Sequence, residues 1–431
     1  MRERAVRRVA GLLRARLPEL DLDRVYDPRA REGRWALSQI LRATLLGLMA
    51  GCRSLWDAER LTDNLAPAMR RRLGLPRRLA DTTARDALCR VPLESLRAAL
   101  HRAVRAAWRR KALAPVGLPF GVVALDGKVT MLPVLNHPLV QNHIEGQAVP
   151  FGLVRTVTCA LVSAAGRPCI DAIPIPAQAN EVGFFQQAFE RLTAVHGGLF
   201  RVVTYDAGAL SEANASAVVA AGKDYLFTLK GEQRTMFKLA SELLGAQEMA
   251  AQTLDVLDNA TTVTRSLTLL GVDPSWSYSG SKTPEESVWG HAGTFLRVEY
   301  VKRRGGEVVE QDARLFVSSL QPGRLTPAQW MLLVRRHWGV ENQNHYTLDT
   351  AFAEDDRPWI EADPQGMLAV LLLRRIAYTL LALYRAVTLR SDEGRATRWR
   401  DLLATVRDVL VAATEEQLAG LRPHPVAVAT R

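Results

Sequence analysis

The sequence predicts an α/β protein: a mixed sheet with flanking helices, an all-helical N-terminal region and a β-rich insertion. Three observations predict it. Residues 1–115 carry apolar side chains at three- to four-residue spacing, which is typical of helices. After Pro119, short β-branched runs alternate with amphipathic segments, which predicts a sheet with helices packed on it. Two alternating runs then flank Gly305 and Gly306, a pattern that indicates a β-hairpin.

The individual elements follow from local signals. In the front region, helices are predicted over 35–51, 54–65 and 92–113, with Gly51 ending the first and Ser54 capping the second. In the core, strands are predicted over 120–128, 153–166, 168–176, 199–208 and 224–231, with helices over 179–197 and 209–222. The predicted divisions are a helical basic region (1–115), the first part of the core (116–231), the insertion lobe (232–322), the core helix with a third acid (323–360), and a C-terminal helical region with a tail (361–431).

Composition argues against several classes of protein. The four cysteines show no Cys-x-x-Cys spacing, so neither a disulfide framework nor a zinc ribbon is expected, and a reducing cytosol fits. The Arg-rich start lacks the apolar run and the cleavage site of a signal peptide. The most apolar run, 367–387, carries Arg374 and Arg375 at its centre. Burying two arginines in a bilayer is costly, so we expect a core helix and no membrane contact.

Positive charge is concentrated at the front of the chain. Residues 1–112 hold 26 basic and 12 acidic side chains, whereas the rest of the chain holds 30 and 33. Such segregation predicts a surface for a polyanion, namely nucleic acid. The alternative is that the arginines only keep the helices soluble, and those near the end of the helix over 92–113 also suit its dipole.

Three acidic residues occupy positions that packing alone does not explain. Asp126 and Asp206 each end a predicted buried strand, and ligands of open sheets gather outside strand ends. Glu341 belongs to a helix that begins with a capping box, where Thr326 is the N-cap and Pro327 is the first helical residue. This start places Glu341 about four turns along the helix.

Convergence of these acids would create a cation site. Two unit charges about 4 Å apart repel by roughly 1 kcal/mol in water and by about 4 kcal/mol at an effective dielectric near 20. Such a cluster persists if it is partly protonated or binds hard cations. Oxygen ligands without cysteine favour Mg²⁺ or Mn²⁺ over zinc. Two such ions can activate an attacking oxygen and stabilise a leaving oxygen in phosphoryl transfer.

Each acid also has a simpler interpretation. Asp126 could start an Asp-Gly turn. Asp206 could cap the following helix, although Ser211 suits that role better. Glu341 could form a surface ion pair with a neighbouring arginine. Glu354 is the main rival as a third ligand, although it follows the point where the helix is expected to end.

Basic and histidine side chains accompany the acids in the sequence. Helical spacing puts His337, Glu341 and His345 on one stripe. The candidates for DNA contact are Lys128, Lys230, Arg335, Arg336, His337 and His345. The lysines could equally be solvated turn residues, and a packing role is the alternative for the histidines. A metalloenzyme built on the histidines and Glu341 is a further alternative.

Several stretches of the chain resemble one family. The stretches are ALDGK, PIPAQANEVGFFQQAF, YDAGALS, DYLFTLKGEQ, LFVSSL and RRHWGVENQNHYTLDTAFAEDD. They resemble bacterial insertion-sequence transposases of the DDE class, in particular the H-repeat-associated subgroup. Residues 27–51 resemble the N-terminal region of the same subgroup. Where related transposases often carry tyrosine, arginine and lysine, this chain has Val334, His337 and Leu348.

The resemblance implies a ribonuclease-H-like core in which Asp126, Asp206 and Glu341 bind two Mg²⁺ ions, with Mn²⁺ as a substitute. It implies cleavage at the element's ends by water, giving a 3′-hydroxyl, and then transfer of that end into target DNA. The expected partners are double-stranded DNA, at terminal inverted repeats and at the target, and a second copy of the chain. A bacterial cytoplasm, at the nucleoid, is the expected location. The rival functions are a DNA-binding protein that no longer cuts and a metal-dependent nuclease of the same fold.

Overall fold

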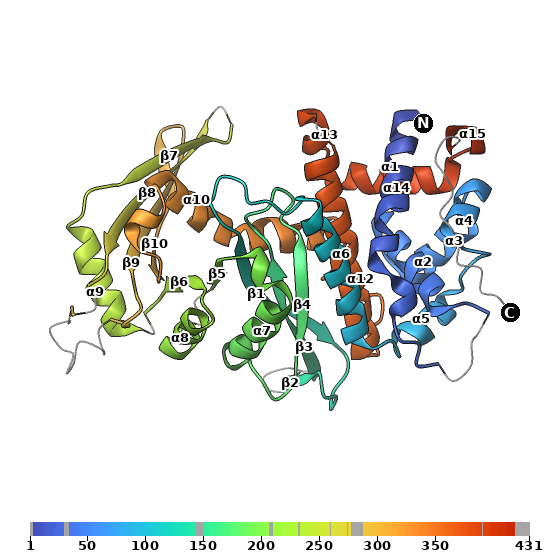
Figure 1. Cartoon of the computed structure of the whole chain (residues 1–431), viewed down its shortest axis with the longest axis horizontal. Coiled ribbons are helices and arrows are strands. Elements are labelled where there is room, and N and C mark those ends of the chain that lie inside the picture. The colour runs from blue at the N-terminus through green and yellow to red at the C-terminus, as the bar shows by residue number, and fades with distance from the viewer. Residues whose placement is uncertain are drawn as a thin grey trace.

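The structure is a computed structural model, and its described residues fall into nine ranges. They are 3–29, 34–143, 150–206, 210–231, 233–258, 260–273, 275–276, 288–389 and 391–418, with only the backbone of Glu181, Val182 and Asn342. The predicted C-terminal tail, beyond residue 418, lies outside these ranges. Figure 1 shows a central sheet between a group of helices from both ends of the chain and an outer set of strands.

Helices from the two ends of the chain pack together. The N-terminal region contains α1 (Glu3–Arg16), η1 (Pro18–Leu20), η2 (Leu22–Arg24), α2 (Leu37–Met49), α3 (Leu55–Asp63), α4 (Pro67–Leu73), α5 (Asp81–Leu88) and α6 (Leu93–Arg109). The C-terminal region contains α12 (Pro364–Leu383), η8 (Tyr384–Thr388), α13 (Asp392–Ala396), α14 (Trp399–Ala412) and α15 (Glu415–Leu418). The long helix α12 packs against α2 and α6, and α14 packs against α1 (Figure 1).

The sheet has ten strands in the described part of the chain. They are β1 (Val122–Leu132), β2 (Gln141–His143), β3 (Phe151–Ala160), β4 (Cys169–Ile175), β5 (Val202–Tyr205), β6 (Asp224–Leu229), β7 (Ala251–Val256), β8 (Thr261–Gly271), β9 (Thr294–Arg304) and β10 (Glu307–Ser318). Their order is β2-β3-β1-β5-β6-β10-β9-β8-β7, and β4 also pairs with β3. The sheet is mixed, as predicted, because β1 is antiparallel to β3 but parallel to β5.

The remaining helices connect these strands. They are α7 (Glu181–His196), η3 (Gly197–Leu199), α8 (Glu212–Ala220), α9 (Arg234–Gly245), η6 (Pro322–Arg324), α10 (Pro327–His337), η7 (Val340–His345) and α11 (Tyr346–Thr350). Local cap predictions are confirmed at three helices. The side chains of Ser54, Ser211 and Thr326 each accept a hydrogen bond from a backbone N–H three residues later.

The outer strands continue the sheet of the core. Strand β10 pairs antiparallel with β6, and β9, β8 and β7 follow in order. Residues 232–322 therefore form no separate sheet in their described part. The predicted hairpin is present between β9 and β10, and its turn has positive φ at Gly305 and Gly306, 60° and 90°. Glycine suits this hairpin turn because it has no Cβ to clash at positive φ.

The prediction that a strand ends at Asp126 is wrong. Strand β1 continues to Leu132, and Asp126 pairs in register with Thr158 of β3. The Asp-Gly pair is thus part of an extended strand rather than a turn. It is the parallel neighbour β5 that stops, at Tyr205. A strand end was predicted because a charged residue, Asp126, is followed by a glycine. Pairing with β3 nevertheless satisfies the backbone hydrogen bonds of the residues after them.

The two faces of the sheet belong to different hydrophobic clusters. Along β1, Val122 and Ala124 join the cluster formed with α10, whereas Val123 and Leu125 join the larger cluster on the other face. The larger cluster also contains side chains of the helices from both ends of the chain. Side chains alternate between faces along a strand, so Asp126 belongs to the face that α10 covers.

Helix α12 is a core helix, as predicted from its central arginines. By length and composition the segment Pro364–Thr388 could cross a membrane, but 94% of its apolar window is buried inside the protein. Arg375 is fully buried and forms two hydrogen bonds with Glu354, of 2.7 and 2.9 Å. Burial is the largest influence and favours the neutral carboxyl, but the charges of Arg375, Arg374, Lys128 and His345 together keep the pKa of Glu354 below its ordinary value.

Arg375→Met should lower the free energy of unfolding by about 3–5 kcal/mol, because it leaves the carboxylate of Glu354 buried without its main partner. Urea denaturation measures this loss. The control is Arg375→Met combined with Glu354→Leu, which should recover part of the loss because the unpartnered carboxylate is removed, although Arg374 and Lys128 stay buried. Equal losses in the single and double variants would contradict this account of the pair.

Candidate functional site

Asp126 and Asp206 are adjacent because of strand register. In the parallel pair of β1 and β5, Leu125 is opposite Tyr205. Asp126 is the next residue of β1, and Asp206 is the residue that directly follows the end of β5. Parallel neighbours lie about 4.8 Å apart, and both aspartates share the alternation that directs Val122 and Val202 into the cluster with α10. The predicted convergence of these two acids is therefore present, on the α10 face of the sheet.

The helix that carries Glu341 is interrupted. Helix α10 ends at His337, and Glu341 lies in the π-helical turn η7. The prediction of one continuous α-helix is wrong, because a π-turn interrupts it. His337, Glu341 and His345 nevertheless each interact with one or both of the two aspartates. His337 is buried, whereas Glu341 is exposed on the face of the turn near the sheet strand β1. Such π-turns frequently occur at functional sites.

Electrostatics show that the three acids are neighbours. Burial, and then the negative charges of Asp126 and Asp206, raise the pKa of Glu341 above its ordinary value. Arg314 and His345 act in the opposite direction. A carboxyl responds to two others in this way only when they are close. The structure therefore brings together the three acids that the sequence singled out.

The two histidines have different surroundings. His345 Nδ1 lies 3.1 Å from Asp126 Oδ2 and orients that carboxylate. His337 is only 5% exposed, its ring packs near Phe316 and Trp338, and burial lowers its pKa to about 4. A neutral, enclosed His337 does not fit the predicted DNA contact, and in this arrangement it is a packing residue. His345 stays a candidate for substrate contact.

The two lysines also differ. Lys230 is half exposed, and its Nζ lies 3.8 Å from Asp206 Oδ1, so it borders the acids as a phosphate contact would. Lys128 is almost buried and is paired with Asp349 and, at 2.7 Å, with Asp355. Its charge is already neutralised, so a phosphate contact by Lys128 would require these pairs to open. That contact was predicted because a strand end was expected at Lys128.

Glu354 belongs to this second group of charges. It is 2% exposed, pairs with Arg375 and lies 3.8 Å from Lys128. The Lys128 group of Lys128, Asp349, Glu354 and Asp355 links β1 to the segment that follows α11. Arg375 already donates hydrogen bonds to both carboxylate oxygens of Glu354. Glu354, the alternative third metal ligand, is therefore engaged in a structural ion pair.

Arg335 and Arg336 lie at the end of α10, where cations suit the helix dipole. Arg335 is exposed and pairs with Asp255 of β7 at 3.2 Å. Arg336 is half-buried. Neither forms an ion pair with Glu341 among the contacts of the described residues. The structure therefore does not support the alternative that Glu341 only forms an ion pair with Arg335 or Arg336.

The donor set fits a hard cation. Within the described ranges, no group of three or more His, Cys, Asp or Glu side chains lies in an arrangement that could hold a metal ion. The carboxylates of Asp126, Asp206 and Glu341 nevertheless offer only oxygen donors, and their mutual repulsion would be relieved by a divalent ion. Buried polar atoms of Asn344 and His345 beside them have no hydrogen-bond partner. Buried polar atoms without a hydrogen-bond partner are often found at functional sites.

No protein-family model matches the chain, and no curated protein matches it. Among solved structures, the chain is similar to a cryo-EM structure of a piggyBac transposase synaptic complex with hairpin DNA. The identity is 12%, the match covers 98% of this chain and 82% of that chain, and the TM-score is 0.41. A likeness this low carries no argument about fold or function.

One residue of the site gave no signal in the sequence. Arg314 of β10 lies with its guanidinium 5.1 Å from the ring centroid of Trp338, and its charge opposes the rise in the pKa of Glu341. Arg314 belongs to the outer strands, which the sequence indicated only as an inserted lobe. Its approach to the acids depends on the pairing of β10 with β6, which no local pattern predicts.

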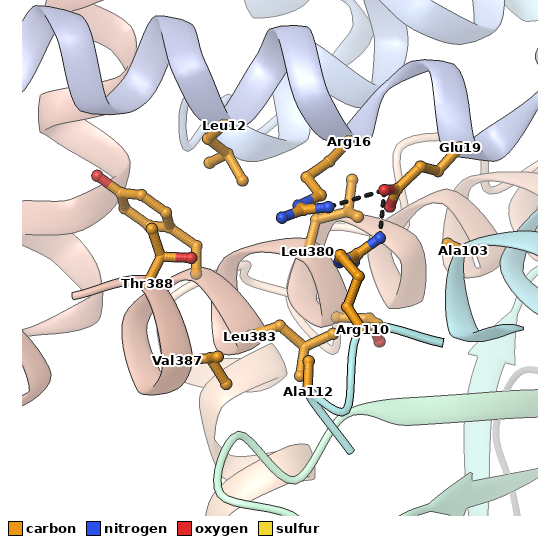
Figure 2. A pocket seen from close by; sticks show the side chains of 12 residues that line it. Leu12, Arg16, Glu19, Ala103, Arg110, Ala112, Leu380, Leu383, Val387 and Thr388 are labelled. Carbon is orange, nitrogen blue, oxygen red and sulfur yellow. Dashed lines mark hydrogen bonds and ion pairs between the residues drawn. The ribbon is translucent and has the colours of Figure 1, made fainter. Parts of the chain in front are cut away.

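A pocket elsewhere in the molecule is not part of this site. It has a volume of about 290 Å³ and lies between α1, α6 and the end of α12 (Figure 2). Its charged side chains satisfy one another, because Arg16 and Arg110 both pair with Glu19. We therefore assign it no ligand.

Changing Asp126 and Asp206 together to asparagine should lower the pKa of Glu341 in the metal-free protein, because two neighbouring negative charges disappear. The contribution of burial remains, so the pKa should stay above its ordinary value. Carbon-13 NMR titration of the glutamate carboxyls measures the change. The control is Asp392→Asn on α13, an exposed acid that should leave Glu341 unaffected. An unchanged Glu341 pKa in the double variant would show that the carboxylates do not meet.

Proposed function

We propose that this protein is a DNA transposase of the DDE class, of the bacterial insertion-sequence type that its motifs resemble. The observation that carries the proposal is the meeting of Asp126, Asp206 and Glu341 on one face of a mixed sheet. The core would be ribonuclease-H-like, since three antiparallel strands are followed by helix, strand, helix and strand. The proposal of a ribonuclease-H-like core is supported by this order of elements alone.

The three acids Asp126, Asp206 and Glu341 would hold two Mg²⁺ ions, or Mn²⁺ in their place. Ions held in this way activate an attacking oxygen and stabilise a leaving oxygen. The side chains of the protein position the acids. His345 fixes the orientation of Asp126 through their 3.1 Å contact, and the π-turn that carries Glu341 contacts β1.

The proposed reaction has two displacements at this one site. Water attacks a phosphodiester at the end of the element and leaves a 3′-hydroxyl. That hydroxyl then attacks a phosphodiester of the target DNA in line, so the end becomes joined to the target while the broken target strand leaves with a free 3′-hydroxyl. Lys230, exposed with its Nζ 3.8 Å from Asp206 Oδ1, would contact a phosphate. The buried, neutral His337 supports the π-turn by packing and does not exchange protons with the substrate.

The proposed partner is double-stranded DNA, as terminal inverted repeats and as target. The positively charged helices of residues 1–112 would supply phosphate contacts that set affinity rather than sequence. Because two ends must be cut together, we propose a homodimer in the DNA complex. A bacterial cytoplasm, at the nucleoid, is the proposed location.

Asp126→Asn, Asp206→Asn and Glu341→Gln should each abolish strand cleavage while DNA binding survives, because each removes one proposed metal ligand. The assay is cleavage of a supercoiled plasmid that carries the candidate ends, with Mn²⁺ or Mg²⁺. The control, Asp392→Asn, removes an exposed acid of α13 and should cut normally. Full cleavage by Glu341→Gln would move the third ligand elsewhere, and cleavage without joining by the wild type would identify a nuclease instead.

DNA affinity should fall steeply with salt if the front helices bind phosphates, by roughly 10³-fold or more between about 50 and 200 mM for six or more contacts. Fluorescence anisotropy with a labelled duplex measures this slope. Replacing the exposed Arg77 and Arg85 with glutamine should reduce the slope. Arg191→Gln, on α7, is the matched control and should not. A DNA affinity that does not change with salt concentration would contradict a phosphate-binding surface on the front helices.

A further inference from the structure

Two half-buried arginines meet beside the π-turn. Arg167 lies in the turn between β3 and β4, and Arg336 lies in the last turn of α10. The side chain of Arg167 crosses the backbone of Gly339, since a Cβ built on that glycine would lie 3.5 Å from Arg167 Cδ. Gly339 is two residues before Glu341. Arg167 therefore lies against the residue that immediately precedes the π-turn, and Arg336 lies three residues before that glycine.

The charge of this pair is not compensated. Among the interactions of the described residues, neither Arg167 nor Arg336 has a carboxylate partner, in contrast to Arg335 with Asp255. The Nε atoms of Arg167 and Arg336 are buried and form no hydrogen bond. Burial, followed by the charge of Arg336, lowers the pKa of Arg167 to about 10. Buried cationic donors without an acceptor are costly, so an anionic ligand would stabilise them.

The position of Arg167 is set by its surroundings before any ligand binds. Its backbone is left-handed, with φ of 44°, and its N–H donates to Ala164 O at 3.1 Å. Its carbonyl accepts a hydrogen bond from the hydroxyl of Tyr378 in α12, at 3.3 Å. The preceding Gly166 approaches α12 so closely that a Cβ there would lie 2.9 Å from Ala382 O. A rigid turn of this kind loses little entropy on binding.

We propose that Arg167 and Arg336 form a binding site for a phosphate oxyanion. Two guanidinium groups suit this ligand because each can donate two hydrogen bonds to the oxygens of one phosphate. The occupant in the working protein is a backbone phosphate of the DNA strand that enters the carboxylate site. That identification of the occupant rests on the proposed function, whereas the anion site itself does not.

Inorganic phosphate is the first probe. NMR of the arginine Nε–H groups in the full-length, metal-free protein should show saturable shifts at Arg167 and Arg336, measured against chloride at equal ionic strength. Arg191 on α7, on the opposite face of the sheet, is the internal reference, and its signal should show no saturable shift with phosphate. Arg167→Gln should abolish the shift of Arg336. Arg167→Lys should retain part of the Arg336 shift, because lysine keeps the positive charge but loses the two parallel N–H donors of the guanidinium. Equal, unsaturable shifts at all arginines would overturn the anion site.

DNA is the second probe and distinguishes a backbone phosphate from a free one. Without divalent ions, Arg167→Gln and Arg336→Gln should each weaken binding of an end-containing duplex roughly ten- to a hundredfold and reduce the salt slope by about one. The matched control, Arg191→Gln, should change neither. Unchanged DNA affinity together with phosphate binding would overturn the DNA assignment. Absence of strand cleavage by the wild type with Mg²⁺ would refute the proposed function yet leave both binding results standing.

Discussion

Mutual repulsion of three carboxylates is the constraint around which this structure is organised. Asp126 and Asp206 meet because two parallel strands are in register, and Glu341 joins them from a π-turn. Burial and the two aspartates together raise the pKa of Glu341, so the arrangement is unfavourable by itself. A protein tolerates such a cluster when the surrounding fold overdetermines it and when a ligand relieves it.

The surrounding fold supplies that support through both faces of the sheet. On one face, α10 packs on alternate residues of the strands and delivers the π-turn. Helix α12, which belongs to the larger cluster, contributes Arg375, which holds Glu354 and, through it, the Lys128 group. Positive charge is distributed unevenly around the site. Arg314 and Lys230 act on Glu341 and Asp206, respectively, Arg167 lies against Gly339 just before the π-turn, and Lys128 is already neutralised.

The prediction from sequence succeeded where the signals were local and failed where pairing decided the outcome. The caps at Ser54, Ser211 and Thr326 are as expected because a side-chain oxygen bonds a backbone N–H only three residues away. The end of a strand at Asp126 was wrong because β3, more than twenty residues later, extends β1. The continuous helix through Glu341 was wrong because one extra residue in a turn leaves no mark in hydrophobic spacing.

The sequence by itself determined the mixed sheet, its flanking helices and the identity of the three acids, since periodicity and short motifs encode these directly. The tertiary structure decided which charges are available. Lys128 and Glu354 are committed to buried ion pairs, whereas Arg167, which carried no local signal, stands unpaired beside Arg336. The reason is physical: the state of a charge depends on burial and on partners distant in the chain, and only the folded molecule specifies both.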